Sequence, residues 1–102
     1  MLASFSVIPL GVGEELKELI AEALSIVDKC GLSYKLGAMQ TTVEGEPEQV
    51  MQVIMDCHRK MLELAPRVLT NITIDDRQGA IDRLSGKVKD VEQIIGRELS
   101  HE

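Results

Sequence analysis

The order in which strand-like and helix-like patterns follow one another constrains the fold of this chain more than any other feature. Four segments alternate apolar and polar residues with the period of a strand: residues 3–9, 33–36, 39–44 and 67–75. Three others repeat apolar residues at helical spacing: about 14–29, about 47–65 and about 80–99. This order predicts an α+β, ferredoxin-like βαββαβ fold with a four-stranded antiparallel sheet and an additional C-terminal helix.

Glycine and proline mark the ends of these elements. Gly31 follows the first helical stripe, Pro47 stands at the start of the second, and Pro66 ends it. The short connection at Gly37 and Ala38 predicts an antiparallel hairpin. The length of 102 residues fits one domain, so we expect residues 1–102 to form a single ferredoxin-like domain.

The alternation also assigns strand residues to the two faces of the sheet. The face under the helices is expected to carry Phe5, Val7, Val43, Ile72 and Ile74. The opposite face is expected to carry Ser4, Ser6, Ile8, Tyr34, Leu36, Thr42, Glu44, Leu69, Asn71, Thr73 and Asp75. Because the second set mixes polar with large apolar side chains, it predicts that this face is covered rather than open to solvent. A second copy of the chain could cover it, so the pattern favours a homo-oligomer.

Charge and composition narrow the classes of partner. Seventeen acidic residues against eleven basic ones give a net charge of −6, which argues against binding to nucleic acid or to an anionic membrane. One Phe, one Tyr and no Trp leave little for base stacking. The start of the chain lacks a basic segment followed by an apolar run, and no stretch approaches the ~20 apolar residues of a membrane span, so we expect a cytoplasmic protein.

Residues that would carry catalysis or bind a metal are scarce. Cys30 and Cys57 both fall within apolar helical stripes, which is typical of reduced core cysteines. His58 follows Cys57, but no second pair of ligands stands at metal-binding spacing. We therefore predict neither an enzyme nor a metal or other cofactor, although an active site shared between subunits stays open.

A threonine-rich run that ends in a carboxylate, from Met39 to Gly45, is the best candidate for ligand binding. Alternation places Met39, Thr41 and Val43 on one face and Gln40, Thr42 and Glu44 on the other. The second face offers an amide, a hydroxyl and a charge. This combination is suited to a small polar molecule.

Several short motifs, taken in order, resemble the small thiamine-binding protein family, in its YkoF-like single-domain group. They are Pro9-Leu10-Gly11, Gly31-Leu32 before Tyr34, Thr41-Thr42-Val43-Glu44-Gly45, Arg67 at the start of the last strand, Ile74-Asp75-Asp76-Arg77 at its end, and Lys87-Val88 with Val91-Glu92. The resemblance covers nearly the whole chain. It implies a ferredoxin-like subunit that pairs through its sheet, and a tetramer built as a dimer of dimers. It also implies a non-catalytic protein that binds thiamine or its hydroxymethylpyrimidine portion at the sheet face near a subunit interface.

Thiamine combines an aminopyrimidine with a cationic thiazolium, and the side chains of the candidate site offer chemistry suited to both. Glu44 would accept a hydrogen bond from the amino group, and Glu44 or Asp75 would complement the cation. The expected ligand-binding residues are Ser4, Ser6, Tyr34, Leu36, Met39, Thr41, Thr42, Glu44, Asn71 and Asp75. If the charge of Glu44 is used, Glu44→Gln should weaken binding by about tenfold or more.

Other interpretations stay open. Glu44 could cap the second helix or pair with Arg67 or Arg77, and the serine and threonine residues could simply form a sheet surface. The alternative function is an oligomeric regulatory or scaffold protein that binds a different metabolite or an anion. A ligand panel would separate the two.

Overall fold

The computed structural model describes residues 1–79 and residue 84, and it confirms the α+β class. Strand β1 (Leu2–Leu10) is followed by a 3-10 turn, η1 (Gly13–Glu15), and by helix α1 (Leu16–Lys29). The hairpin of β2 (Ser33–Leu36) and β3 (Thr41–Glu44) comes next, then helix α2 (Pro47–Leu64) and strand β4 (Arg67–Asp75). The helix predicted at about 80–99 lies outside the described residues.

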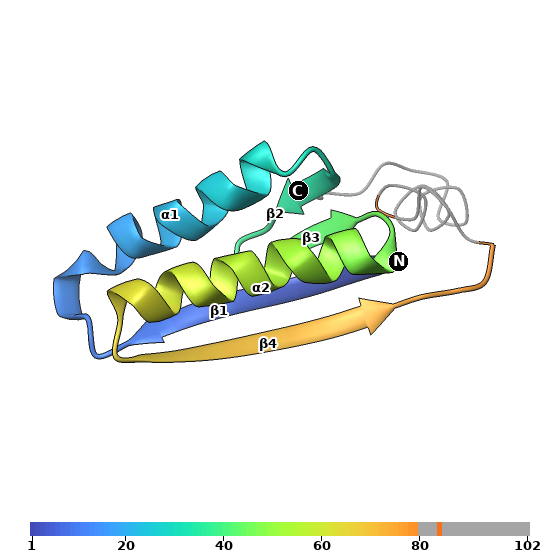
Figure 1. Cartoon of the computed structure of the whole chain (residues 1–102). Helices are drawn as coiled ribbons and strands as arrows, with labels where there is room; N and C mark the ends of the chain where they lie inside the picture. Colours follow the sequence, from blue (N-terminus) through green and yellow to red (C-terminus); the bar gives the residue numbers. More distant parts are fainter. Residues whose placement is uncertain (80–83, 85–102) are drawn as a thin grey trace, which may run out of the picture.

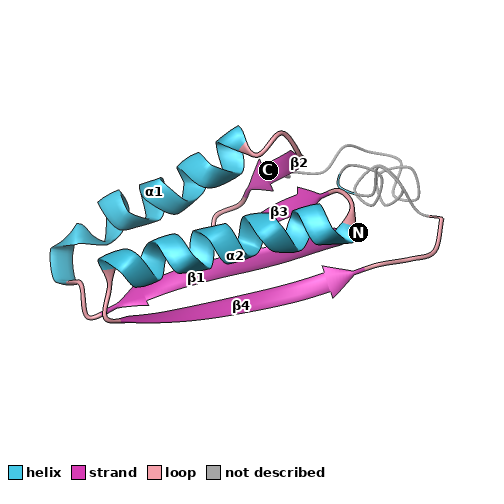
Figure 2. Ribbon diagram, viewed as in Figure 1, coloured by secondary structure: helices cyan, strands magenta, loops and turns pink. Residues whose placement is uncertain are grey.

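The four strands form one antiparallel sheet in the order β2-β3-β1-β4. Both helices lie on the same side of this sheet, as Figures 1 and 2 show. Strands β1 and β4 are long and pair over nine residues, whereas β2 and β3 are only four residues long. Among the described strands, this inequality in length leaves the β3 side of β1 unpaired beyond Phe5.

The ends of the helices follow from local chemistry. Gly31 adopts a φ of +82° just after α1, a conformation that a glycine at this position accommodates without strain. Pro47 occupies the first turn of α2, where a missing N–H costs no intrahelical hydrogen bond. Within the described residues, no helix is long and apolar enough to cross a membrane.

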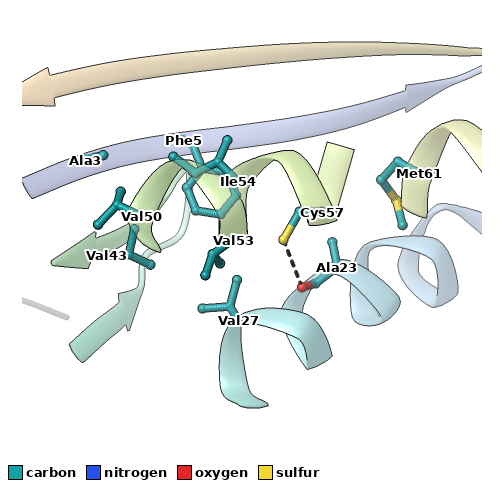
Figure 3. Packing of buried hydrophobic residues seen from close by; sticks show 10 residues of the cluster. All are labelled: Ala3, Phe5, Ala23, Val27, Val43, Val50, Val53, Ile54, Cys57 and Met61. Carbon is teal, nitrogen blue, oxygen red and sulfur yellow. Dashed lines mark hydrogen bonds between the residues drawn. The ribbon is translucent and has the colours of Figure 1, made fainter. Parts of the chain in front are cut away.

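The core is aliphatic and lies between the two helices and the sheet (Figure 3). Its largest fully buried side chains are Val27, Val43, Val50, Ile54, Cys57 and Met61. Each large aliphatic side chain removed from water in this way contributes roughly 1.5–3 kcal/mol to folding. The predicted core members Phe5 and Val43 are buried, and Val7 is half-buried.

The register of the sheet corrects two face assignments. Tyr34 pairs with Val43, and Leu36 pairs with Thr41. Residues directly opposite each other project to the same face, so Tyr34 and Leu36 lie on the helix side of the sheet. The prediction that they share the outer face with Thr42 and Glu44 is wrong.

Two expected core residues are more exposed than predicted. Ile72 pairs with Phe5 and Ile74 pairs with Ala3, so both are on the predicted face. Ile72 is nevertheless 37% exposed and Ile74 50% exposed. Strand β4 is one of the two edge strands of the described sheet, and Figure 1 shows it lying beyond the helix α2 that covers β1.

The third strand is shorter than the sequence pattern suggests. It begins at Thr41 rather than Met39, and Met39 is 87% exposed in the connection that precedes it. A hydrogen bond from the Gly37 N–H to the Gln40 carbonyl oxygen, 2.8 Å long, closes this connection into a turn. The turn therefore takes up four residues, 37–40, rather than two.

Candidate functional site

A cavity of about 350 Å³ opens where β2 ends and β3 begins, beside the part of β1 that pairs only with β4. Its walls come from three parts of the chain. Ile20 and Leu24 project from α1, residues 5–8 belong to β1, and residues 36–41 span the end of β2, the turn and the start of β3. Because β3 begins at Thr41, opposite Phe5, no described strand lies on that side of β1 beyond Phe5, and this leaves room for the hollow.

The cavity lining is mostly apolar with a few hydrogen-bonding groups. Ser6, Gln40 and Thr41 supply the polar side chains, and Thr41 is 8% exposed. Among the described lining residues, none has a carboxylate, ammonium or guanidinium group. A concave apolar site with a few polar groups suits a flat, largely uncharged ring.

Cys57 contributes a thiol to the inner wall of this cavity. The thiol is fully buried and donates a hydrogen bond to the carbonyl oxygen of Ala23, with 3.4 Å between the atoms (Figure 3). Burial raises the pKa of Cys57 to about 12, so the thiol keeps its proton at neutral pH. This agrees with the prediction of a structural cysteine.

The outer face of the sheet carries a cluster of polar side chains separate from the cavity. Ser4 lies between Thr42 and Thr73 in one row, and the Ser4 and Thr42 hydroxyl oxygens are 3.1 Å apart. In the next row Leu2 lies between Glu44 and Asp75. Each of these rows crosses β3, β1 and β4.

Glu44 already has a hydrogen-bond partner within the chain. One of its carboxylate oxygens accepts a hydrogen bond from the main-chain N–H of Leu84, with 3.2 Å between the atoms. Residues 44 and 84 are forty positions apart, so this contact fixes the end of β3 to a distant part of the chain. A ligand at Glu44 would have to share this carboxylate with the Leu84 amide.

The structure divides the predicted ligand-binding residues into two groups. Ser6, Leu36, Met39 and Thr41 line the cavity. Ser4, Thr42, Glu44, Asn71 and Asp75 lie on the outer face. Ser6 belongs by register to the outer face, but it also reaches the cavity because β1 has a free side there.

Tyr34 belongs to neither group. Its hydroxyl donates a hydrogen bond of 2.5 Å to the carboxylate of Asp28 at the end of α1. This hydrogen bond raises the pKa of Tyr34 above its ordinary value. Among the described residues, no contact directs Tyr34 toward the cavity or toward the polar side chains of the outer face.

Sequence reasoning missed the contribution of α1. Ile20 and Leu24 line the cavity, yet in the sequence they are ordinary members of an amphipathic stripe. Gln40 was assigned to a strand and instead belongs to the turn. The cavity depends on β3 beginning at Thr41 rather than Met39, and the alternation of residues 39–44 does not reveal this start.

A second hollow of about 450 Å³ lies between the end of α1 and the start of α2. Its lining includes Cys30, Glu48, Gln52 and Asp56. Within the described part of the chain, no group of histidine, cysteine and acidic residues is placed to hold a metal ion.

Together these features define a small α+β protein with a ligand-sized cavity at the open end of its sheet. A family model described as thiamine-binding protein matches residues 3–92, and the chain therefore belongs to the thiamine-binding protein family. The UPF0045 protein of Mycobacterium bovis is 39% identical over 98 residues, which cover 95% of this chain and 96% of that protein.

Solved structures agree with this assignment. A hypothetical protein of Methanocaldococcus jannaschii has a TM-score of 0.82 at 26% identity and matches 90% of this chain and 95% of its own. A candidate thiamine biosynthesis/salvage protein of Thermotoga maritima has a TM-score of 0.78 at 30% identity, covering 88% of this chain and 96% of that one. These matches confirm the family resemblance read from the sequence.

Proposed function

We propose that this chain is a cytoplasmic, non-catalytic binding protein for thiamine or its hydroxymethylpyrimidine portion. The observation that carries the proposal is the cavity of about 350 Å³ in a member of the thiamine-binding protein family. Small-molecule sites are typically concave, mostly apolar and about 300–1,000 Å³ in volume. The cavity meets these criteria at the small end of the range.

The aminopyrimidine ring is the part of thiamine that suits the cavity. Its two faces are apolar and would contact side chains such as Leu24 and Leu36, while its edge needs hydrogen bonds. Ser6 and Gln40 can supply donors and acceptors from the lining. The cationic thiazolium has no charged partner among the described lining residues, so in this arrangement it lies at the mouth.

This placement differs from the sequence-based expectation that Glu44 receives the amino group. Glu44 already accepts a hydrogen bond from the Leu84 N–H and lies on the outer face of the sheet, not in the cavity lining. The cavity offers burial of the ring between α1, β1 and the turn at residues 37–40. We therefore assign the pyrimidine to the cavity and leave Glu44 a role in holding the end of β3.

Calorimetric titration of the protein with thiamine and with hydroxymethylpyrimidine tests the proposal. We expect saturable, micromolar binding of both ligands to the wild-type protein. Leu24→Trp should fill the cavity and reduce affinity at least tenfold, or by about 1.4 kcal/mol. Leu62→Trp is the matched control, because Leu62 is 52% exposed on α2 and does not line the cavity.

Glu44→Gln distinguishes the two locations in the same assay. Binding in the cavity predicts an affinity close to that of the wild-type protein, whereas binding at the outer face predicts the loss of about tenfold or more. If neither ligand gives heat at two temperatures, the proposal fails and a different metabolite or an anion becomes the better candidate. Mass spectrometry of the ligand after incubation tests the non-catalytic role, since a changed mass would contradict it.

We also propose that the protein is a homo-oligomer in which the outer sheet face contacts a second copy, and that such pairs form a tetramer. Ile8 and Leu69 lie opposite each other on that face and are 38% and 48% exposed. Serine and threonine hydroxyls both donate and accept, so such a face can pair with itself around a two-fold axis. Light scattering should give a tetramer for the wild-type protein and a smaller species for Leu69→Lys.

A further inference from the structure

The main chain of β1 presents hydrogen-bonding groups to the cavity at Val7. Met1 and Gly45 exchange two main-chain hydrogen bonds, N to O at 2.9 Å and 3.1 Å, so Met1 points its N–H and C=O toward the β3 side. In an antiparallel ladder this direction alternates from one residue to the next. Ala3, Phe5, Val7 and Pro9 therefore point the same way as Met1.

The position of Pro9 independently supports this direction of the main-chain groups of β1. It pairs with Val68 inside the continuous β1–β4 ladder, although it has no N–H to donate. A proline is tolerated in a paired strand where its nitrogen faces the side without a partner. Pro9 therefore faces away from β4, and Val7, two residues earlier, does the same.

The strand that would satisfy Val7 is missing at this level. Pairing between β1 and β3 ends at Phe5 and Thr41, so the next partner on that side would be Met39. The chain instead turns at residues 37–40, where Gly37 donates to the carbonyl oxygen of Gln40. Within the described residues, no main-chain hydrogen bond joins Val7 to this turn. Val7 also lines the cavity.

We propose that the Val7 main chain recognises the edge of the pyrimidine ring. The amino group of the ligand donates to the Val7 carbonyl oxygen, and the adjacent ring nitrogen accepts from the Val7 N–H. An aminopyrimidine thus takes the place of the missing β3 residue in the ladder. This inference rests on the proposed function, and it explains how a cavity with so few polar side chains can select such a ring.

A ligand pair tests the recognition directly. Replacing the amino group of thiamine by a carbonyl oxygen, as in oxythiamine, turns the donor into an acceptor and places a hydrogen on the adjacent nitrogen. Both hydrogen bonds to Val7 are then mismatched. We expect calorimetry to give at least tenfold weaker binding for oxythiamine than for thiamine. Equal affinities would overturn the inference.

A substitution tests the protein side. Val7→Pro removes the N–H without breaking a hydrogen bond to β4, because this residue faces the other way. Val7→Ala is the matched control, since it also loses the valine side chain but keeps the N–H. We expect Val7→Pro to bind thiamine at least tenfold more weakly than Val7→Ala, with both variants checked for folding by circular dichroism. Equal binding by the two variants would contradict the inference.

Amide hydrogen exchange of the wild-type protein, followed by NMR, keeps the inference testable even if Val7→Pro does not fold. We expect the Val7 amide to exchange at least tenfold more slowly when hydroxymethylpyrimidine is bound. Thiamine binding without this protection overturns the role of Val7 and leaves the proposed function standing. Absence of thiamine and hydroxymethylpyrimidine binding overturns the proposed function, and this inference with it.

Discussion

Cys57 links the core to the cavity, and its buried thiol makes stability depend on pH. Its pKa rises from an ordinary value of 9.0 to about 12 in the folded protein, mainly because burial disfavours the thiolate. Above pH 9 the unfolded chain loses this proton while the folded protein keeps it. The unfolded state then binds fewer protons, so the free energy of unfolding contributed by Cys57 falls as pH rises from 9 toward 12.

We predict that Cys57→Ala is less stable than the wild-type protein at neutral pH by roughly 1–3 kcal/mol, because a cavity replaces the buried sulfur. The variant lacks the titrating thiol, so the difference should shrink at about pH 10. Urea unfolding at both pH values measures it. A difference that stays constant or grows would show that the thiol does not titrate as its burial implies.

Individual residues also show how far a candidate site can be predicted from sequence. Ser6, Leu36, Met39 and Thr41 were selected from the sequence and do line the cavity. Glu44 was selected by its charge at the end of a strand, and nothing in the sequence indicates that Leu84, forty positions later, donates to it. Long-range main-chain contacts of this kind depend on the tertiary path of the chain, which periodicity does not contain.

At the scale of elements, the turn at residues 37–40 shapes the cavity, and Gly37 is its most constrained residue. A Cβ atom added to Gly37 would lie 2.8 Å from the main-chain oxygen of Gln40, the same atom that accepts the hydrogen bond closing the turn. A backbone atom cannot move aside as a flexible side chain can. The turn must therefore distort to accept any larger residue.

We predict that Gly37→Ala lowers the free energy of unfolding by about 1–3 kcal/mol, the usual range for an overpacked position. It should also weaken thiamine binding, since the turn forms part of the cavity wall. Ala38→Ser is the control for the stability measurement, because Ala38 is exposed and the change adds a single atom. Urea unfolding and calorimetry measure the two effects. Equal stability of the two variants would mean that the turn tolerates the contact.

The elements whose ends carry strong signals were predicted well. Pro47 and Pro66 bracket α2, and the long alternation of β4 matches its observed bounds. The predicted start of the third strand was wrong because residues 39–44 alternate like a strand through the turn. The pattern alone does not show at which residue pairing begins. The assignment of the β2 side chains to the outer face was wrong for the same reason, since the register of a hairpin follows from its turn.

At the scale of the whole molecule, the chain has a net charge of −6, and the described lining of its cavity contains no basic residue. Thiamine itself is a cation, so the field of the protein favours its approach. Thiamine pyrophosphate carries a negatively charged tail on the thiazolium side. With the pyrimidine in the cavity as proposed, this tail would lie at the mouth, in the field of a protein whose net charge is −6.

We therefore predict that thiamine binds at least roughly tenfold more tightly than thiamine pyrophosphate, a difference of about 1.4 kcal/mol. Because the discrimination is electrostatic and acts at an exposed mouth, it should shrink as salt shortens the screening length from roughly 30 Å at 0.01 M to about 10 Å at 0.1 M. Calorimetry of both ligands at the two salt concentrations measures it. A preference for the pyrophosphate would show that basic groups of the chain or of a second subunit stand at the mouth, and the charge argument would be wrong. A preference for thiamine that salt leaves unchanged would point instead to steric exclusion of the phosphates.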